Sequence, residues 1–514
     1  MRRSVTAAAM AAALSAAMAV AVPGAATAQT GCDGGADFNG DNCGDDLIGD
    51  PAATVNGKVN AGRINVLYGS ATGTGTRAVL AQGQAGVADT AETDDLFGAV
   101  VQVMRVDGDQ YADLVVGVPR ESVGTTEDAG IIQVIYGSAG GLGAGRPGLV
   151  LRQGLFEIPG GPEPGDQFGA AVRANKTEHT SGDAPAPALA WGAPGEDIGS
   201  TADAGSAGLI TFGQTGGVVA AGGVNQDSPG ISGAVEAGDR FGQAIDVFQG
   251  PSGFSCPVSG TRGLTMVVGV PGEDFGTTRD AGMVHVVRNL AGDSLLSQDE
   301  PAVEGTPEAG DQFGSAVAVA SECEHDGPLH VRLVAGTPGE DIGAVADAGM
   351  IHYFGTDDEE IPLPHRWSVH QNSIDVADQS EAGDSFGSVL ALGGPWRGDN
   401  IGESIVVGVP REDVGTAVDG GAVHVFGDSL NAPGSTDLFT TQAHVGAQAE
   451  TGDQFAAAVA VAQGRLLVGA PDDVTHDKGV VHGIPWEPTG TVITFVPGQD
   501  GIPADAVRFG ASVG

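Results

Sequence analysis

A unit of about seventy residues, repeated along the whole chain, constrains the fold of this protein more than any other feature. Each copy carries three signals in the same order: Phe-Gly before a run of small apolar residues, an apolar stretch that ends in Gly-x-Pro, and a glutamine before the next Phe-Gly. Short runs of small apolar residues of this kind are typical of buried strands. In five copies the glutamine precedes the phenylalanine by fifteen residues, which indicates that one structural unit is being repeated.

The three signals occupy fixed positions. The phenylalanines are Phe97, Phe168, Phe241, Phe313, Phe386, Phe455 and Phe509. The prolines of Gly-x-Pro are Pro51, Pro119, Pro194, Pro271, Pro338, Pro410 and Pro471. The glutamines are Gln82, Gln153, Gln226, Gln298, Gln371 and Gln442.

Four short strands per unit, without a helical pattern, predict the blades of an all-β propeller. The first Gly-x-Pro, ending at Pro51, has no Phe-Gly before it, and the last Phe-Gly, at Phe509, has no Gly-x-Pro after it. We therefore expect a seven-bladed propeller of four-stranded blades, closed by the C-terminal strand at residues 509–514, which becomes the innermost strand of the first blade. Closure leaves only short strand edges exposed.

Phe-Gly and Gly-Ala-Pro, in this order and spacing, resemble the FG-GAP repeats of the integrin α-subunit N-terminal β-propeller and of related bacterial secreted proteins. The resemblance covers essentially the whole chain after residue 28. It implies an FG-GAP propeller, but propellers carry binding, adhesion and enzymatic roles alike, so the resemblance does not by itself assign a function.

Residues 1–28 have the pattern of a secretory signal peptide. Arg2 and Arg3 precede an apolar run that ends near Val22, and Ala26-Thr27-Ala28 forms a small-x-small cleavage site. The alternative is an uncleaved membrane anchor, which the short apolar run disfavours. We expect a signal peptide (1–28) followed by a single seven-bladed propeller (29–514) that is secreted, extracellular and not inserted in a membrane.

The charge of the chain limits its partners. The formal net charge is −44 at pH 7, which repels the phosphates of nucleic acid and of anionic lipid. Such a surface favours cations, basic proteins or neutral glycans. We expect an extracellular protein or glycan as ligand, no nucleic acid, and a monomer.

The segment from Asp37 to Asp45 is the strongest candidate for a metal site. Asp37, Asn39, Asp41 and Asp45 place oxygen side chains at positions 1, 3, 5 and 9 of a glycine-containing loop, with the Cys43 carbonyl at position 7. This pattern suits a hard cation with six to eight oxygen ligands, and it looks like the calcium loop of integrin-type blades. Calcium is therefore the expected cofactor. The alternative is an acidic turn without metal.

A second loop has the same register but lacks the first carboxylate. Asp107, Asp109 and Asp113 are its weaker candidate ligands, while Arg105 occupies the first position. A guanidinium there can pair with Asp109 or Asp113 and replace the ion.

The four cysteines allow three pairings, which sequence alone does not distinguish. Export permits disulfides. We favour Cys32–Cys43, which are close in the sequence, and Cys256–Cys323, which fall in the same loop of consecutive blades.

Acidic pairs follow Gly-x-Pro in four units, and we expect them to share one face with the loops that join consecutive blades. Such a polyanionic face would recruit cations or a basic partner. The alternative is that the aspartates cap turns and the glutamates keep the surface soluble. The candidate binding-face residues are Glu196, Asp197, Glu273, Asp274, Glu340, Asp341, Glu412 and Asp413.

These features favour a calcium-stabilised module for binding or cell adhesion over an enzyme. One alternative is an extracellular hydrolase, because some FG-GAP proteins resemble the propeller part of phospholipases and polysaccharide-degrading enzymes. No carboxylate pair or Ser-His-Asp set stands outside the repeat, so no catalytic residue is assigned. A purely structural surface protein is the third possibility.

Overall fold

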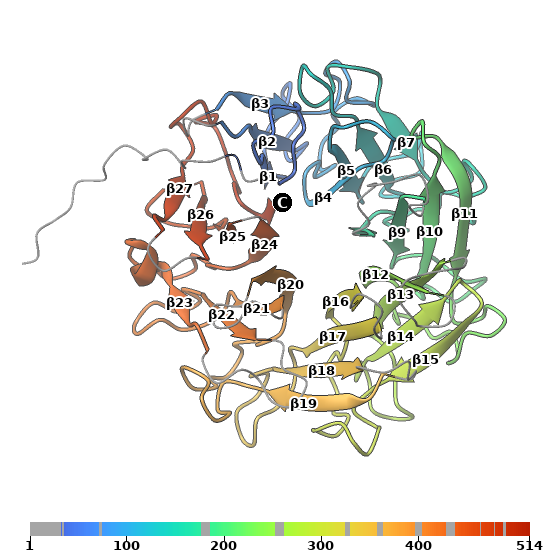
Figure 1. Ribbon diagram of the computed structural model, residues 1–514. Coiled ribbons are helices and arrows are strands. Elements are labelled where there is room, and N and C mark those ends of the chain that lie inside the picture. The colour runs from blue at the N-terminus through green and yellow to red at the C-terminus, as the bar shows by residue number, and fades with distance from the viewer. Residues whose placement is uncertain are drawn as a thin grey trace, which may run out of the picture.

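Seven antiparallel four-stranded sheets form a ring of blades around a central axis in the computed structural model (Figure 1). The structure describes residues 32, 35–70, 75–175, 186–251, 262–323, 329–356, 363–395, 403–427, 437–462, 464–476, 478–486 and 490–514. Within these ranges the single helix is the short 3-10 turn η1 (Gln442–Val445). The predicted all-β, seven-bladed propeller is confirmed. The proposed signal peptide lies outside the described residues.

Blades 2 to 7 each consist of four consecutive strands, ordered from the axis to the rim. Blades 2, 3 and 4 contain β4 (Val100–Met104), β5 (Asp113–Val118), β6 (Ile131–Ile135), β7 (Leu149–Leu151); β8 (Ala171–Ala174), β9 (Ala188–Ala193), β10 (Ser206–Phe212), β11 (Val218–Val224); β12 (Ala244–Pro251), β13 (Arg262–Val270), β14 (Met283–Arg288) and β15 (Gly292–Leu296). Blades 5, 6 and 7 contain β16 (Ala316–Cys323), β17 (Leu329–Thr337), β18 (Met350–Thr356), β19 (His365–Val369); β20 (Val389–Pro395), β21 (Glu403–Val409), β22 (Ala422–Gly427), β23 (Thr440–Thr441); β24 (Ala458–Ala462), β25 (Arg465–Ala470), β26 (Val480–Pro485) and β27 (Ile493–Phe495).

Blade 1 is assembled from both ends of the chain, as the offset between the two signals predicted. Its order from the axis outward is β28 (Ser512–Val513), β1 (Asp46–Asp50), β2 (Arg63–Leu67) and β3 (Arg77–Leu80). Ile48 pairs with Val513 and Gly49 with Ser512. The ring is therefore closed by main-chain hydrogen bonds between the two ends of the chain.

The two glycine signals are explained by the close approach of neighbouring blades. A Cβ atom on Gly192, the glycine of Gly-x-Pro in blade 3, would lie 2.0 Å from the carbonyl oxygen of Gly242, the Phe-Gly glycine of blade 4. Gly242 itself has a φ of +92°, a conformation that disfavours other residues. Glycine at both positions lets the blades touch through their backbones.

The seven Phe-Gly phenylalanines are fully buried, and the strands beside them supply the rest of the core. Phe241, for example, packs in one cluster with Ala207 of blade 3 and Val268 of blade 4. Its backbone amide donates to the carbonyl oxygen of Ala204 in the preceding blade at 2.9 Å. Each phenylalanine thus packs at the junction of two blades, which we call a seam and number by the blades that it joins.

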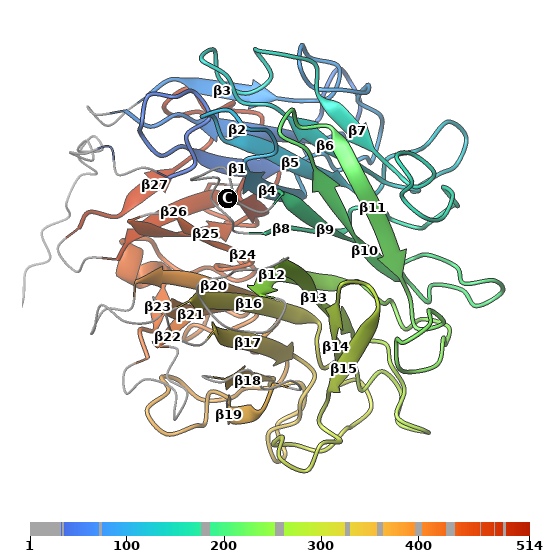
Figure 2. The same cartoon turned by 45° about the vertical axis from the view of Figure 1, so that its right-hand side comes forward.

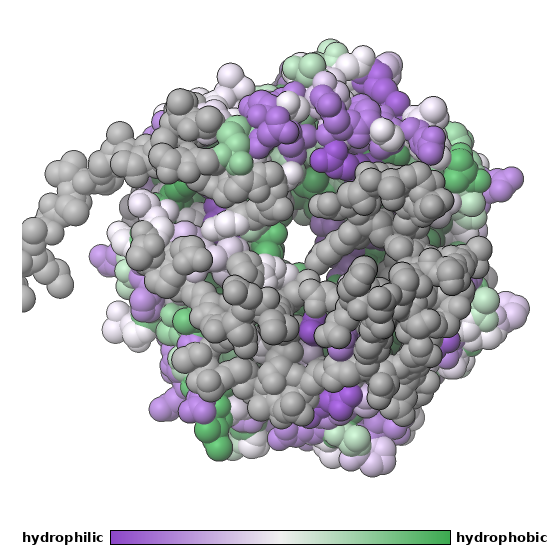
Figure 3. Space-filling model, in the orientation of Figure 1, coloured by the Kyte–Doolittle hydropathy of each residue, from purple (hydrophilic) through white to green (hydrophobic). Residues whose placement is uncertain are grey.

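The sheets of neighbouring blades pack face to face, with the outer strands β7, β11 and β15 at the rim and an opening at the centre of the ring (Figures 2 and 3). In the described part of the chain, no helix has the length and apolar character needed to cross a membrane.

Candidate functional site

The repeated glutamine reaches across each seam to an acidic residue of the next blade. Gln82, after β3 of blade 1, donates from Nε2 to Oε2 of Glu121, after β5 of blade 2, at 2.5 Å. Four further seams repeat this bond between the amide and a glutamate, and seam 6–7 has aspartate in place of glutamate. The other pairs are Gln153–Glu196, Gln226–Glu273, Gln298–Glu340, Gln371–Glu412 and Gln442–Asp473.

A second buried acid completes each of these six seams. It is the aspartate two residues before the phenylalanine, and one carboxylate oxygen accepts the backbone N–H three residues upstream. In seam 3–4 this bond joins the Glu236 nitrogen to Oδ2 of Asp239 at 2.6 Å, and Asp239 is fully buried. The six aspartates are Asp95, Asp166, Asp239, Asp311, Asp384 and Asp453.

Burial and crowding of like charges raise the pKa values of these acids. The pKa rises to about 6 for Asp95 and to about 7 for Asp166, Asp239, Asp311 and Asp384, chiefly through burial, with neighbouring carboxylates adding to the shift. Burial likewise raises the pKa of Glu121 to about 8 and that of Glu412 to about 9, against the opposing effect of the glutamine hydrogen bond. Protons are therefore retained in these seams near neutral pH.

The seams contain more hydrogen-bond acceptors than donors. The Oε1 atom of each of the six glutamines is buried and has no hydrogen-bond partner. The same holds for Oδ1 of Asp166, Oδ1 of Asp239 and Oε1 of Glu412. Because a buried oxygen without a partner is costly, a proton, water or cation is the natural complement to these atoms.

The eight predicted binding-face residues lie on the predicted face but divide into two layers. The glutamates turn inward to the seams, and Glu273, Glu340 and Glu412 are each at most 7% exposed. The paired aspartates turn outward: Asp197 and Asp341 are exposed, while Asp274 and Asp413 are half-buried. Oδ1 of each aspartate accepts the backbone N–H six residues later, as at Asp203 and Asp347, both at 3.0 Å. The turn-capping role predicted for the aspartates is confirmed, whereas the glutamates are structural and do not serve surface solubility.

Seam 1–2 is the place where three acids converge. One carboxylate oxygen each from Glu92, Asp95 and Glu121 lies within 4.8 Å of the other two. Among the described residues this is the one group of at least three His, Cys, Asp or Glu side chains with such spacing. The sequence analysis did not identify Glu121 or its bond to Gln82. The fixed position of the glutamine in each unit did indicate a contact that recurs from one unit to the next.

Closure of the ring replaces the glutamine pair by an ion pair at seam 7–1. Arg63 of β2 contacts Asp50 through Nη2 at 2.9 Å and Asp505 through Nη1 at 2.8 Å. Asp50 is fully buried, and its Oδ1 also accepts the N–H groups of Val507 and Arg508. The repeat signals did not indicate this exception, because Asp50 is the variable residue of the first Gly-x-Pro and Arg63 and Asp505 lie outside the three signals.

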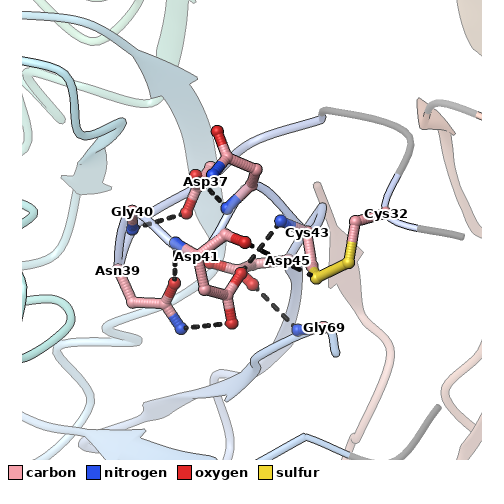
Figure 4. Close-up of a disulfide and its surroundings, with 9 residues drawn as sticks. Cys32, Asp37, Asn39, Gly40, Asp41, Cys43, Asp45 and Gly69 are labelled. Atoms are coloured by element: carbon pink, nitrogen blue, oxygen red, sulfur yellow. Dashed lines mark hydrogen bonds between the residues drawn. A yellow bond between two sulfur atoms is a disulfide. The ribbon is translucent and has the colours of Figure 1, made fainter. Parts of the chain in front are cut away.

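The predicted metal loop is held closed by its own backbone (Figure 4). Asp37 accepts the N–H groups of Gly40 and Asn42 at 2.6 and 2.9 Å. Asp45 accepts those of Phe38 and Gly69, both at 2.8 Å. Asn39 accepts the Asp41 N–H, and Asp41 accepts the Cys43 N–H, each at 2.9 Å. These bonds are those of an acidic turn, and Asp37, Asp41 and Asp45 do not form a converging group of ligand oxygens.

The second loop is organised in the same way. Asp113 accepts the N–H groups of Val106 and Gly137 at 2.7 and 2.9 Å, and Asp109 accepts that of Tyr111 at 2.9 Å. Arg105 donates to the carbonyl oxygen of Gln110 and not to the predicted aspartates.

A different arginine neutralises this loop. Arg146 lies 3.3 Å from Oδ2 of Asp107 and stacks over the ring of Tyr136. Because Arg146 precedes β7, outside the loop itself, the loop sequence did not reveal it.

One of the two predicted disulfides is formed. Cys32 is bonded to Cys43 and tethers the first acidic loop (Figure 4). Cys256 and the side chain of Cys323 lie outside the described residues.

Comparison with known proteins gives structural matches only. No family model matches the chain, and no curated protein matches it. Two solved structures of mutant apocarotenoid oxygenase from Synechocystis match over 94% of both chains, with 10% and 9% identity and TM-scores of 0.44 and 0.45. A chimera of this oxygenase and RPE65 matches over 91% of both chains, with 10% identity and a TM-score of 0.44. At these values the likeness assigns no oxygenase activity to the chain.

The expected function and cofactor need correction. The calcium-stabilised binding or adhesion module finds no support in the comparisons, because no family model and no curated protein matches the chain and the matched structures are named as oxygenases. Calcium as cofactor is likewise not supported by the comparisons, and in the structure both carboxylate oxygens of Asp37 and of Asp45 accept backbone N–H groups.

Proposed function

We propose that the chain is an FG-GAP repeat protein whose acid-rich face holds small polyvalent cations. The family assignment is supported by the equivalent use of the repeat signals, because glycine of Gly-x-Pro meets the next Phe-Gly backbone at successive seams. The acid-rich face is the one formed by the loops between second and third strands and the loops between blades.

The observation that carries this proposal is the division of the acid-rich face into two layers. The inner layer consists of the seam acids, whose raised pKa values keep part of it protonated. The outer layer consists of exposed carboxylates that repeat around the ring, and those of Asp197 and Asp341 each accept a backbone N–H. Its members include Glu163, Asp197, Asp203, Glu236, Asp280, Glu308, Asp341, Asp347 and Glu381.

Carboxylates gathered on one face create a negative potential that attracts cations over about a Debye length, ~8 Å at physiological ionic strength. A polyvalent cation contacts several of these carboxylates at once, so its binding free energy is more favourable than that of a monovalent ion. The fit is to a flexible, multiply charged ligand of the polyamine class.

Calorimetric titration with spermine tests the proposal. The double substitution Asp197→Asn and Asp341→Asn removes two charges, while each new amide oxygen still accepts the backbone N–H that the carboxylate accepted. We expect spermine affinity to fall about fivefold in low salt and the difference to shrink in 0.5 M NaCl.

The matched control is the pair Asp41→Asn and Asp109→Asn. These aspartates are also exposed and also accept one backbone N–H each, but they lie in the segments that precede the second strands of blades 1 and 2. The control should bind spermine as the wild type does. Equal loss in both variants, or no loss in the first, contradicts the proposal.

We also propose that the chain is exported with cleavage after Ala28 and works as a monomer. The support is the sequence pattern of residues 1–28. Intact mass of the exported protein tests the cleavage, and light scattering tests the monomer. A mass that retains residues 1–28, or a dimer at micromolar concentration, contradicts it.

A further inference from the structure

We propose that Asn56 is a site of spontaneous covalent modification, at which its side-chain amide is lost as ammonia and an aspartyl or isoaspartyl residue is left in the loop between β1 and β2. This inference does not depend on cation binding at the outer layer. Asn-Gly occurs twice in the chain, at Asn39-Gly40 and at Asn56-Gly57. Glycine has no Cβ to hinder attack by its own backbone nitrogen on the preceding side chain. The two pairs are alike in sequence, and the structure distinguishes them.

The Asn56 turn is a tight hairpin at the surface. Val55 and Lys58 exchange backbone hydrogen bonds at 3.0 and 2.9 Å, and Asn56 and Gly57 have φ values of 52° and 81°. These φ values are those of a type I′ turn, for which Asn-Gly is the preferred sequence. Both turn residues are exposed, and a Cβ on Gly57 would meet nothing within 4 Å.

The two reacting groups of this turn have no hydrogen-bond partner within the part of the chain that the structure describes. Nothing there accepts the N–H of Gly57, and nothing there binds the side-chain amide of Asn56. Only the two bonds between Val55 and Lys58 hold the turn in place. An exposed turn with so few bonds opens locally at a small cost in free energy, so the nitrogen of Gly57 can reach the Asn56 side chain.

The second Asn-Gly pair is held in place on every side (Figure 4). The N–H of Gly40 donates to Oδ1 of Asp37 at 2.6 Å, and Oδ1 of Asn39 accepts the N–H of Asp41 at 2.9 Å. A Cβ on Gly40 would lie 2.5 Å from the ring of Tyr111, so the backbone has no room to turn. Attack by the Gly40 nitrogen requires these contacts to break first.

The reaction balances with water as the sole co-reactant. The backbone nitrogen of Gly57 gives up its proton and bonds to Cγ of Asn56, while the Cγ–Nδ2 bond breaks and ammonia leaves with that proton. Water then adds to either carbonyl of the five-membered imide and opens it to an aspartyl or an isoaspartyl residue. The product places a carboxylate in a loop, residues 51–62, whose sequence contains no acidic residue.

Peptide mapping by mass spectrometry tests the proposal on the whole exported protein, incubated at pH 8 and 37 °C. Asn56 should convert at least about tenfold faster than Asn39, because the bonds of the folded loop protect Asn39. In urea, with the disulfide reduced, the two asparagines should convert at similar rates, since each is followed by glycine. Asn39 is thus a control within the same molecule.

The variant Gly57→Ala identifies the attacking atom. Its methyl group meets no neighbour, so the fold is retained, and conversion at Asn56 should slow several-fold while Asn39 is unaffected. An unchanged rate at Asn56 in this variant overturns the proposal. So does conversion of Asn56 no faster than that of Asn39 in the folded protein. A difference between the two that persists in urea overturns it as well, because the neighbouring sequence and not the fold would then set the rates.

Discussion

At the scale of single residues, two glycines per repeat are required by contact distance. The α-carbon of Gly192 faces the carbonyl of Gly242 so closely that no side chain fits between them. The Phe-Gly and Gly-x-Pro signals are therefore two halves of one contact between blades, which is why they recur together.

Substitution of Gly192 by alanine should lower the free energy of unfolding by about 3 kcal/mol, because the new methyl group would lie 2.0 Å from a backbone oxygen that cannot move alone. The control is Gly161→Ala, where a Cβ would meet nothing within 4 Å. Urea denaturation measures both. A neutral Gly192→Ala would show that the blades separate easily.

The seam acids should make stability depend on pH. Burial raises the pKa of Asp239 from 3.8 to about 7, with Glu273, Glu236 and Asp274 as the nearby acids that add to the shift. The protonated form is thus favoured by folding, and the stability it contributes is complete below pH 4 and is lost as pH rises through 7.

Asp239→Asn mimics the protonated acid, so its melting temperature should fall less than that of the wild type between pH 5 and pH 8. Differential scanning calorimetry across this range makes the comparison. The same pH dependence of the melting temperature in both proteins would contradict the raised pKa of Asp239.

At the scale of elements, the short strand β28 completes the sheet of blade 1 and is anchored by Phe509. This phenylalanine is fully buried in a cluster with Ile48 of β1 and Val481 of β26. Phe509 therefore packs blade 1 against blade 7, where the ring closes.

Phe509→Ala should cost about 3–5 kcal/mol of unfolding free energy, the usual range for a buried phenylalanine. Val507→Ala is the control, since Val507 is 46% exposed and such changes are typically within about 0.5 kcal/mol. Chemical denaturation followed by fluorescence compares them. Equal stability of the two variants would mean that closure contributes little.

The strands, their order and the closing strand were predictable because each repeats a short pattern whose period and offset the sequence displays directly. The contacts between side chains could be predicted less well from the sequence. Glu196 and Asp197 are adjacent acids, yet one is bonded to Gln153 inside the seam and the other caps a turn in solvent. The oxygen spacing of the Asp37 loop suited calcium, but spacing does not show that the Asp37 carboxylate oxygens accept the N–H groups of Gly40 and Asn42.

At the scale of the whole molecule, charge opposes compactness. The chain carries a formal net charge of −44, and the self-repulsion of this charge favours the expanded chain. Added salt screens this repulsion.

The melting temperature should therefore rise as NaCl increases from about 0.02 to 0.3 M, over the range in which the Debye length shortens most. Calorimetry at fixed pH measures the change, with an uncharged osmolyte as control for general solvent effects. A falling melting temperature would indicate that ion pairs such as Arg63–Asp50 outweigh the repulsion.

The joining of Leu47 to Gly514, which exchange backbone hydrogen bonds at 2.7 and 3.1 Å, fixes the order in which the molecule can fold. Blades 2 to 7 are each made from neighbouring segments and can form as soon as those segments meet. Blade 1 has to wait until almost the entire chain is arranged, because closing a loop of several hundred residues costs about 5 kcal/mol in chain entropy. Seam 7–1 is thus expected to assemble last, and until it does the incomplete ring has two unpaired strand edges that can pair with other chains.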